Sequence, residues 1–358
     1  DDNTTLEVSG VPTTPLATSL DLNIQNSGTT IRFLSALLST LSGKYRLDGT
    51  ARMQQRPMAD LIDAIKQLGG EIRSLGENNC PPLLVEGTGW QGGVATLGGD
   101  ISSQFLSGLL LAAPHATEDV TLEITTPLVS EPYVRMTTSV MASFGVEVSR
   151  PTPASYLVRS PQTYHGVEYQ VEPDASAASY FWAAAAIAGG KVTVLDLTAE
   201  ALQGDVAFCD CLQSMGCHLT TTKDGLTVEA GPLNGITVDM NAISDTVQTL
   251  AVVALFAEGP TRITNVAHIR HKESDRIGDL ARELRKLGAT IVEHDDGLTI
   301  EPGSLRAAEL DTYEDHRMAM SLALAGLKVP GVIINDPGCT AKTYPDYFQD
   351  LERVVRGD

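Results

Sequence analysis

A repeat of about 70 residues constrains this chain more than any other feature of its sequence. One helix type recurs, which begins in small or polar residues and continues almost wholly apolar, as in "NSGTTIRFLSALLSTLSG" and "PDASAASYFWAAAAIAGG". Stretches rich in β-branched residues, such as "KVTVLDL", follow these helices and predict strands. The five copies are separated by 74, 73, 70 and 71 residues and begin near Gly28, Ser102, Ala175, Asp245 and His316.

A second, amphipathic helix alternates with the apolar one and ends on a glycine, as in "RPMADLIDAIKQLGGEI" and "DRIGDLARELRKLGATI". A glycine directly after the last apolar turn predicts a helix end in the left-handed region. A helix that is apolar on every side must be buried on every side. We therefore expect an α/β protein with internal apolar helices, surrounded by sheets and amphipathic helices, in five complete units and one truncated N-terminal unit.

The repeat also predicts two domains. Residues 1–25 resemble the last strands of a sixth unit, and six units divide into two groups of three. The polar stretch Tyr169–Ser176 is the expected crossing point between an N-terminal domain, residues 1–171, and a C-terminal domain, residues 172–358. A length of 358 residues agrees with two domains.

The charge balance excludes several classes of partner. The chain has 45 acidic and 25 basic residues and a net charge of −20, whereas a nucleic-acid-binding surface must be basic. No apolar run reaches the roughly 18 residues of a membrane span, and the first residues do not form a secretory signal. We expect a cytoplasmic protein with no membrane partner.

Five scattered cysteines indicate reduced thiols, because an odd number in a long chain does not suggest a disulfide framework. Cys209, Cys211 and Cys217 stand close to His218 in "FCDCLQSMGCHL". Their spacing is helical and no second pair of ligands accompanies them, so we interpret them as buried apolar residues rather than a metal site.

Polar and charged residues gather where the apolar helices begin. A helix N-terminus presents unpaired N–H groups and the positive end of the helix dipole, so it attracts anions. Capping by Ser, Thr or Asp explains part of the pattern, and Asp315 is an expected cap, but capping does not require Arg32, Gln104, His316 or Arg317. We expect the helix N-termini to form one shared anion site.

Two basic clusters, "RMQQRPM" and "IRHKESDRI", also precede helices in this acidic chain. Arginine side chains bind phosphate and carboxylate groups through paired hydrogen bonds, so these clusters favour such a ligand. The sequence contains no GxGxxG, GxxxxGK[ST] or GxSxG motif. The candidate acid–base groups, each set among cations, are Asp245, Glu273, His316 and Lys342.

These motifs, in order along the whole chain, resemble those of the 5-enolpyruvylshikimate-3-phosphate synthase family. The resemblance rests on "NSGTTIR", "RMQQRP", "DISSQFLSGLLLAAP", "VSEPYVRMT", "VEPDASAASYF", "DTVQTLAVVALFA", "KESDRI", "YEDHRMAM" and "DPGCTAKTYPDYF". It implies transfer of the enolpyruvyl group of phosphoenolpyruvate to the 5-hydroxyl of shikimate 3-phosphate, through a tetrahedral intermediate and without a metal or organic cofactor. The implied fold is a two-domain inside-out α/β barrel of βαβαββ units.

The resemblance also implies roles for individual residues. Asp245 would act as base toward the 5-hydroxyl and Glu273 would handle the proton at the methylene carbon, with His316 and Lys342 also catalytic. Shikimate 3-phosphate would be held by Arg32, Ser102, Ser103, Gln104, Ser130, Tyr133, Asp245 and Lys272. Phosphoenolpyruvate would be held by Gly28, Arg56, Gln104, Arg276, His316, Arg317 and Lys342. We expect a monomer with these two small molecules as its partners.

Three departures from the family pattern accompany the resemblance. Roughly one repeat unit, with a lysine- and serine-containing stretch, has no counterpart before the first residues of this chain. Ser27, Thr30 and Phe33 replace the residues of the commoner "NAGTAMRP", which bears on sensitivity to the herbicide glyphosate. His268 lies where the family often carries a small polar residue.

Three alternatives remain beside this assignment. The first is an anion-binding fragment that does not turn over. The second is the related UDP-N-acetylglucosamine enolpyruvyl transferase, which carries a reactive cysteine that "DGTARMQQRP" lacks. The third, an RNA 3′-phosphate cyclase, is disfavoured by the acidic charge balance.

Overall fold

The computed structural model describes residues 5–10 and 19–357. Contacts within the chain define two compact units, one from residues 1–97, 108–123 and 149–163, and the other from residues 98–107, 124–148 and 164–358. We refer to them as unit 1 and unit 2. The domain boundary expected between residues 171 and 172 stays a prediction.

The first sheet of unit 1 has the strand order β1-β2-β4-β3. β1 and β2 pair in parallel, whereas β4 is antiparallel to both of its neighbours. The helices of this segment are α1, Gly28–Thr40, and α2, Ala59–Gln67, with a short 3₁₀ helix η1, Met53–Gln55, between them. The strands are β1 Ser19–Asn23, β2 Gly43–Asp48, β3 Glu71–Ser74 and β4 Leu83–Gly87.

A second sheet repeats this strand order as β5-β6-β8-β7. Its strands are β5 Gly93–Leu97, β6 Val120–Ile124, β7 Val148–Thr152 and β8 Ser155–Val158. The connecting helices are α3 Ser103–Ala112, η2 Ala113–His115 and α4 Glu131–Ser143. Because the order recurs about 70 residues later in the chain, the repeat predicted from the sequence is present in the sheet topology.

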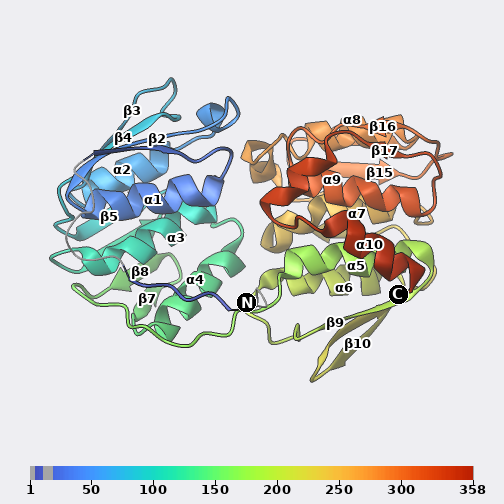
Figure 1. Cartoon of the computed structure of the whole chain (residues 1–358), viewed down its shortest axis with the longest axis horizontal. Helices are drawn as coiled ribbons and strands as arrows, with labels where there is room; N and C mark the ends of the chain where they lie inside the picture. Colours follow the sequence, from blue (N-terminus) through green and yellow to red (C-terminus); the bar gives the residue numbers. More distant parts are fainter. Residues whose placement is uncertain (1–4, 11–18, 358) are drawn as a thin grey trace. The chain divides into compact units, whose positions relative to one another are not determined.

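Three apolar helices form the interior of unit 2: α5 Ala175–Ala188, α7 Val247–Ala254 and α9 His316–Ala323. All eight residues of α7 are buried, and α7 packs against both α5 and α9 (Figure 1). The Thr249 hydroxyl lies 3.3 Å from the Ser179 hydroxyl on α5 and 3.2 Å from the Ser321 hydroxyl on α9. The prediction of internal apolar helices is confirmed in this unit.

Strands and amphipathic helices surround these three helices. The sheet β12-β13-β15-β14 again has the repeated order, and β10-β11-β9 and β16-β17 are smaller. The strands are β9 Lys191–Leu195, β10 His218–Thr222, β11 Gly225–Glu229, β12 Thr237–Asp239, β13 Thr261–Thr264, β14 Thr290–His294, β15 Gly297–Glu301, β16 Glu309–Leu310 and β17 Ile333–Ile334. The outer helices are α6 Phe208–Met215, α8 Gly278–Lys286 and α10 Tyr347–Arg356.

Glycines end the amphipathic helices as the sequence predicts. Each has a positive φ, which glycine adopts without the steric cost that a side chain brings, so the chain can turn sharply into the next strand. The four are Gly69, Gly145, Gly216 and Gly288.

Short 3₁₀ helices precede or follow several α-helices of unit 2, and they change one prediction. Asp245 does not begin an α-helix but lies in η4, a 3₁₀ segment directly before α7 in which Ile243 has the non-helical angles φ −126° and ψ 40°. The 3₁₀ helices are η3 Gly204–Ala207, η4 Asn241–Thr246, η5 Ala267–His271, η6 Leu324–Leu327 and η7 Pro337–Lys342.

Two further expectations concern the strands predicted near the chain start and a membrane-spanning helix. Of the tail strands predicted in residues 1–25, β1 is present, while residues 1–4 and 11–18 lie outside the described part of the chain. Among the described residues, no helix has both the length and the apolarity to span a membrane.

Candidate active site

Four segments of unit 2 place charged side chains around Asp245. Asp245 comes from η4, directly before α7. Lys272, Glu273 and Arg276 come from the loop between η5 and α8. Arg317 lies in the first turn of α9, and Lys342 ends η7. The structure thus brings together six residues that the sequence predicts from four separate motifs.

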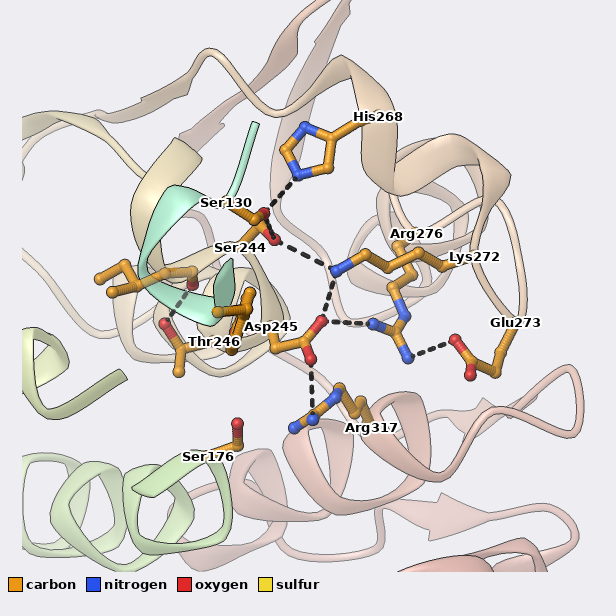
Figure 2. Close-up of polar contacts among 12 residues, drawn as sticks. Ser130, Ser176, Ser244, Asp245, Thr246, His268, Lys272, Glu273, Arg276 and Arg317 are labelled. Carbon is orange, nitrogen blue, oxygen red and sulfur yellow. Dashed lines mark hydrogen bonds and ion pairs between the residues drawn. The ribbon is translucent and has the colours of Figure 1, made fainter. Parts of the chain in front are cut away.

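Asp245 is the centre of this charged network (Figure 2). Its Oδ1 accepts hydrogen bonds from Lys272 Nζ at 2.5 Å and from Arg276 Nη1 at 3.0 Å. Its Oδ2 accepts one from Arg317 Nη2 at 2.9 Å. One carboxylate therefore contacts three cations, which leaves the cluster with an excess of positive charge.

Arg276 joins Asp245 to two further carboxylates. Its side chain is 1% exposed, and its Nη2 donates to Glu273 at 3.0 Å and to Asp315 at 3.1 Å. Its Nε donates to the other oxygen of Asp315 at 2.7 Å. Lys342 Nζ donates to the second oxygen of Glu273 at 2.9 Å. Glu273 is thus held between an arginine and a lysine, at the edge of the same network.

The charges fix the protonation states of the network. Burial alone would raise the pKa of Asp245, but Arg317, Lys272 and Arg276 outweigh it and hold that pKa well below its usual range. Burial lowers the pKa of Lys272, although Asp245 opposes this shift. For Arg276, burial is outweighed by its carboxylate partners, which raise its pKa. Asp245 is therefore an ionised carboxylate across the physiological pH range.

Two neighbouring residues at the start of α9 differ in their role. Asp315 caps the helix as predicted, since its Oδ1 accepts from the Arg317 backbone N–H at 3.0 Å. His316 is buried, and its Nδ1 has no hydrogen-bond partner among the described residues. Burial, followed by the charge of Arg317, lowers the pKa of His316 to about 3, so its imidazole is neutral.

A chain of hydrogen bonds joins Ser130 to the charged network (Figure 2). The Ser130 hydroxyl lies 3.2 Å from His268 Nε2 and 3.1 Å from the Ser244 hydroxyl, which accepts from Lys272 Nζ at 3.1 Å. Burial, together with Lys272, lowers the pKa of His268 to about 3. His268 departs from the family pattern in the sequence, but its contact with Ser130, which links segments 138 residues apart, was not predicted.

Tyr133, on α4, contacts a carboxylate that the sequence analysis did not select. Its hydroxyl donates to Asp205 Oδ1 at 2.9 Å and reaches Oδ2 at 3.1 Å. The Ser176 hydroxyl, from the first turn of α5, donates to Asp205 as well. Asp205 is 2% exposed. In the sequence it looks like an ordinary acidic residue in a helix's first turn, and only its partners distinguish it.

The remaining predicted residues lie at the N-termini of α1 and α3. In unit 1, a Cβ built at Gly28 would lie 2.4 Å from Arg56 Nη2, so only glycine allows this guanidinium to approach the helix. Arg56 Nη1 donates to the Asn26 carbonyl at 3.3 Å, and Arg32 is buried on α1. In unit 2, the described bond among the α3 candidates is local, from the Gln104 N–H to the Ser102 hydroxyl at 3.3 Å, and Ser103 is buried beside it.

The cysteines do not form a metal site in the described residues. Cys209, Cys211 and Cys217 are buried free thiols, and burial raises the pKa of each. No group of three or more His, Cys, Asp or Glu side chains in residues 5–10 and 19–357 is arranged to hold a metal ion.

This arrangement can bind a polyanion and move a proton. Arg276, Arg317, Lys272 and Lys342 converge with Asp245 and Glu273, so an anionic ligand would meet cations while an ionised carboxylate lies within reach of its hydroxyl groups.

Comparisons with known proteins give similarities over nearly the whole chain. The family model for EPSP synthase (3-phosphoshikimate 1-carboxyvinyltransferase) matches residues 1–351. A 3-phosphoshikimate 1-carboxyvinyltransferase of Nostoc punctiforme is 48% identical over 334 residues, which are 93% of this chain and 78% of that protein. One of Marinomonas is 45% identical over 99% of this chain and 84% of its own length.

Solved structures show the same fold. The structure of EPSP synthase from Acinetobacter baumannii matches with a TM-score of 0.75 and 28% identity, over 95% of this chain and 79% of that one. The enolpyruvyl transferase NikO from Streptomyces tendae matches with a TM-score of 0.70 at 22% identity, over 89% of this chain and 74% of that one. The predicted inside-out α/β fold is confirmed by these neighbours.

Proposed function

The chain belongs to the EPSP synthase family, and we propose that it transfers the enolpyruvyl group of phosphoenolpyruvate to the 5-hydroxyl of shikimate 3-phosphate, with release of phosphate. The observation that carries this proposal is the network in which Asp245 contacts Lys272, Arg276 and Arg317. Both substrates are polyanions, and most of the catalytic work is to neutralise their charges and align them.

The proton transfers fall to the two carboxylates of the network. Asp245 takes the proton of the 5-hydroxyl while the hydroxyl oxygen forms a bond to C2 of phosphoenolpyruvate. Glu273, in its protonated form, delivers a proton to the methylene carbon, which gives the tetrahedral intermediate. Glu273 then takes a proton back from that carbon as the C–O bond to phosphate breaks, and the proton held by Asp245 passes to the departing phosphate. An ionised Asp245 can act as the base because its cations keep it deprotonated.

The cations have complementary tasks in this proposal. Arg276, Arg317 and Lys342 hold the phosphate and carboxylate of phosphoenolpyruvate, with His316 beside them, and the family resemblance also assigns Gly28, Arg56 and Gln104 to this ligand. Lys342 also lies 2.9 Å from Glu273 and keeps that carboxylate oriented toward the methylene carbon. A neutral His316 can donate one hydrogen bond to the departing phosphate without adding charge.

The 3-phosphate of the acceptor is bound by hydroxyl groups and cations at other helix N-termini. Ser102, Ser103 and Ser130 supply hydroxyl donors, Arg32 and Lys272 supply charge, and Gln104 and Tyr133 contact the ring. Ser130 is joined through Ser244 to Lys272, so a phosphate at this point would meet an ordered set of donors.

A phosphate-release assay with both substrates tests the function. We expect phosphate to appear only when shikimate 3-phosphate and phosphoenolpyruvate are both present, and none when UDP-N-acetylglucosamine replaces the acceptor. The assay should include a version of the chain extended at its N-terminus by the matching unit of a longer relative, since this chain spans 78–84% of the relatives compared. No release from either version would refute the proposed activity.

Two finer predictions remain with this proposal. A domain boundary between residues 171 and 172 predicts that limited proteolysis cuts first near Tyr169–Ser176. We also propose that the protein is a cytoplasmic monomer. A monomer predicts a mass near 38.0 kDa by light scattering.

A further inference from the structure

Asp205 occupies a position that the proposed reaction does not use. It accepts hydrogen bonds from the Tyr133 hydroxyl, at 2.9 and 3.1 Å, and from the Ser176 hydroxyl. These two donors come from α4 and α5, while Asp205 itself comes from η3. A carboxylate that is 2% exposed and joins three elements is costly to bury, and two hydroxyl donors offset only part of that cost.

The backbone around Asp205 is held in place from both sides. Gln203 Oε1 accepts from the Ala175 N–H at 2.9 Å, and Glu172 accepts from the Leu202 N–H at 2.8 Å, so this loop is tied to the start of α5. A Cβ built at Gly204 would lie 2.6 Å from Pro132 Cβ, so glycine lets α4 approach closely. The Asp205 carboxylate is therefore fixed opposite Tyr133.

The groups that face Asp205 make its charge state sensitive to pH near neutrality. Burial and, after it, the charge of Asp245 on η4 raise the pKa of Asp205, while Ser176, Arg317 on α9 and Tyr133 act in the opposite direction, and the net pKa is about 6. Burial, followed by the charge of Asp205, raises the pKa of Tyr133 well above 10, so the phenol keeps its proton. Near neutral pH, Tyr133 is the donor and Asp205 the ionised acceptor.

A tyrosine hydroxyl has a single proton to donate. When that proton is directed to Asp205, the phenol oxygen can offer only its lone pairs to a ligand. We propose that Asp205 is a positioning residue which fixes Tyr133 as a hydrogen-bond acceptor for a ring hydroxyl of the acceptor substrate. This inference rests on the proposed function, in which Tyr133 contacts that ring.

The arrangement favours a ligand with a free hydroxyl over one with an ether or keto oxygen at the same position. An ether oxygen has no proton to donate and would leave the Tyr133 oxygen unpaired or face it with another acceptor, which costs more than a lost neutral contact. When Asp205 gains a proton, it can itself donate to Tyr133, and the phenol is then released to donate elsewhere.

The test compares Asp205→Asn with the wild-type protein by calorimetric titration of shikimate 3-phosphate between pH 5 and pH 8. The substrate phosphate also titrates near pH 6, so the diagnostic quantity is the ratio of the two dissociation constants at each pH. We expect the variant to bind about tenfold more weakly at pH 8, the effect of one charge-assisted hydrogen bond, and nearly equally at pH 5. A ratio that does not change with pH would overturn the proposal.

A double-mutant cycle shows whether Asp205 acts through Tyr133. In a Tyr133→Phe background, Asp205→Asn should change the dissociation constant by less than twofold, because the hydroxyl that Asp205 orients is gone. An undiminished tenfold effect in that background would mean that Asp205 acts by another route and would refute the inference.

Ser176→Ala provides a second variant if Asp205→Asn does not fold. It removes a donor from Asp205, so the pKa of Asp205 rises and the weakening of binding begins at a higher pH than in wild type. An unchanged profile would count against the proposal. If the wild-type chain and its N-terminally extended version neither bind shikimate 3-phosphate nor release phosphate, the proposed function fails, whereas a normal wild type with the wrong variant pattern refutes only the role of Asp205.

Discussion

Asp245 and Asp205 are two aspartates of the same unit whose surroundings differ in kind. Asp245 accepts from three cations, Lys272, Arg276 and Arg317. Asp205 accepts hydrogen bonds from two neutral hydroxyl groups. Within residues 5–10 and 19–357, it forms no ion pair. The pKa of Asp245 is held well below its usual range, whereas that of Asp205 is raised to about 6.

The difference shows how the same side chain is given two tasks. Burial opposes ionisation in both cases, and what decides the outcome is whether the partners carry charge. A carboxylate among cations stays ionised, and it can accept a proton from a bound ligand once the phosphate of that ligand offsets the cations and raises its pKa. A carboxylate among hydroxyls titrates close to physiological pH and suits the orientation of a neighbour.

The largest effect is expected for Asp245→Asn. Loss of the base should lower kcat by about 10³-fold, within the range for general base catalysis, in a phosphate-release assay. Because the variant leaves Lys272, Arg276 and Arg317 without their shared counter-ion, binding of the anionic substrates should be equal or tighter by calorimetry. A variant that loses binding as well as turnover would show that Asp245 organises the cations rather than acting as the base.

A third buried carboxylate tests how far the network also stabilises the fold. Asp315 accepts from Arg276 and caps α9, and it is fully buried. Asp315→Asn should lower the free energy of unfolding by about 3 kcal/mol, because the buried guanidinium of Arg276 loses one of its negatively charged partners. Urea denaturation measures this change.

The matched control for this prediction is Glu352→Gln, which removes an exposed pair with Arg356 on α10. Exposed ion pairs contribute little to stability, so the free energy of unfolding of the control should stay within about 0.5 kcal/mol of the wild-type value. Equal effects of the two variants would mean that burial of the Arg276 pair adds nothing.

The sequence predicted Asp245 and its cations because they recur at helix N-termini and in short ordered motifs. It did not predict that Asp245 lies in a 3₁₀ segment, because residue types alone do not separate a 3₁₀ turn from the first turn of an α-helix. The apolar helices were predictable for a simpler reason: their composition allows no exposed face.

Asp205 could not be found in the same way. In "LQGDVAF" it has the composition of a first helical turn, where an acidic residue is ordinary. Its burial and its bond to Tyr133 come from α4, 72 residues earlier in the chain. The contact of His268 with Ser130 likewise joins distant segments. Pairings of this kind depend on tertiary packing, which local patterns do not encode.

The smallest effect compares the acid sensitivity contributed by His268 and by Asp205. The pKa of His268 falls to about 3 in the folded protein, from about 6.5 when unfolded, so its contribution to stability is present above pH 6.5 and is lost as the pH falls. His268→Asn should reduce the loss of unfolding free energy between pH 7 and pH 5.5 by about 1 kcal/mol, measured by urea denaturation at each pH.

Asp205 should act with the opposite sign over the same interval. Its folded pKa of about 6 lies above the unfolded value, so the folded state takes up a proton first and gains stability as the pH falls through 6. Asp205→Asn should therefore increase the loss between pH 7 and pH 5.5, by just under about 1 kcal/mol. If both variants shift the acid sensitivity in the same direction, the contrast between a buried neutral histidine and a buried aspartate held by hydroxyls is wrong, and the charge of Asp205 must be balanced by a cation after all.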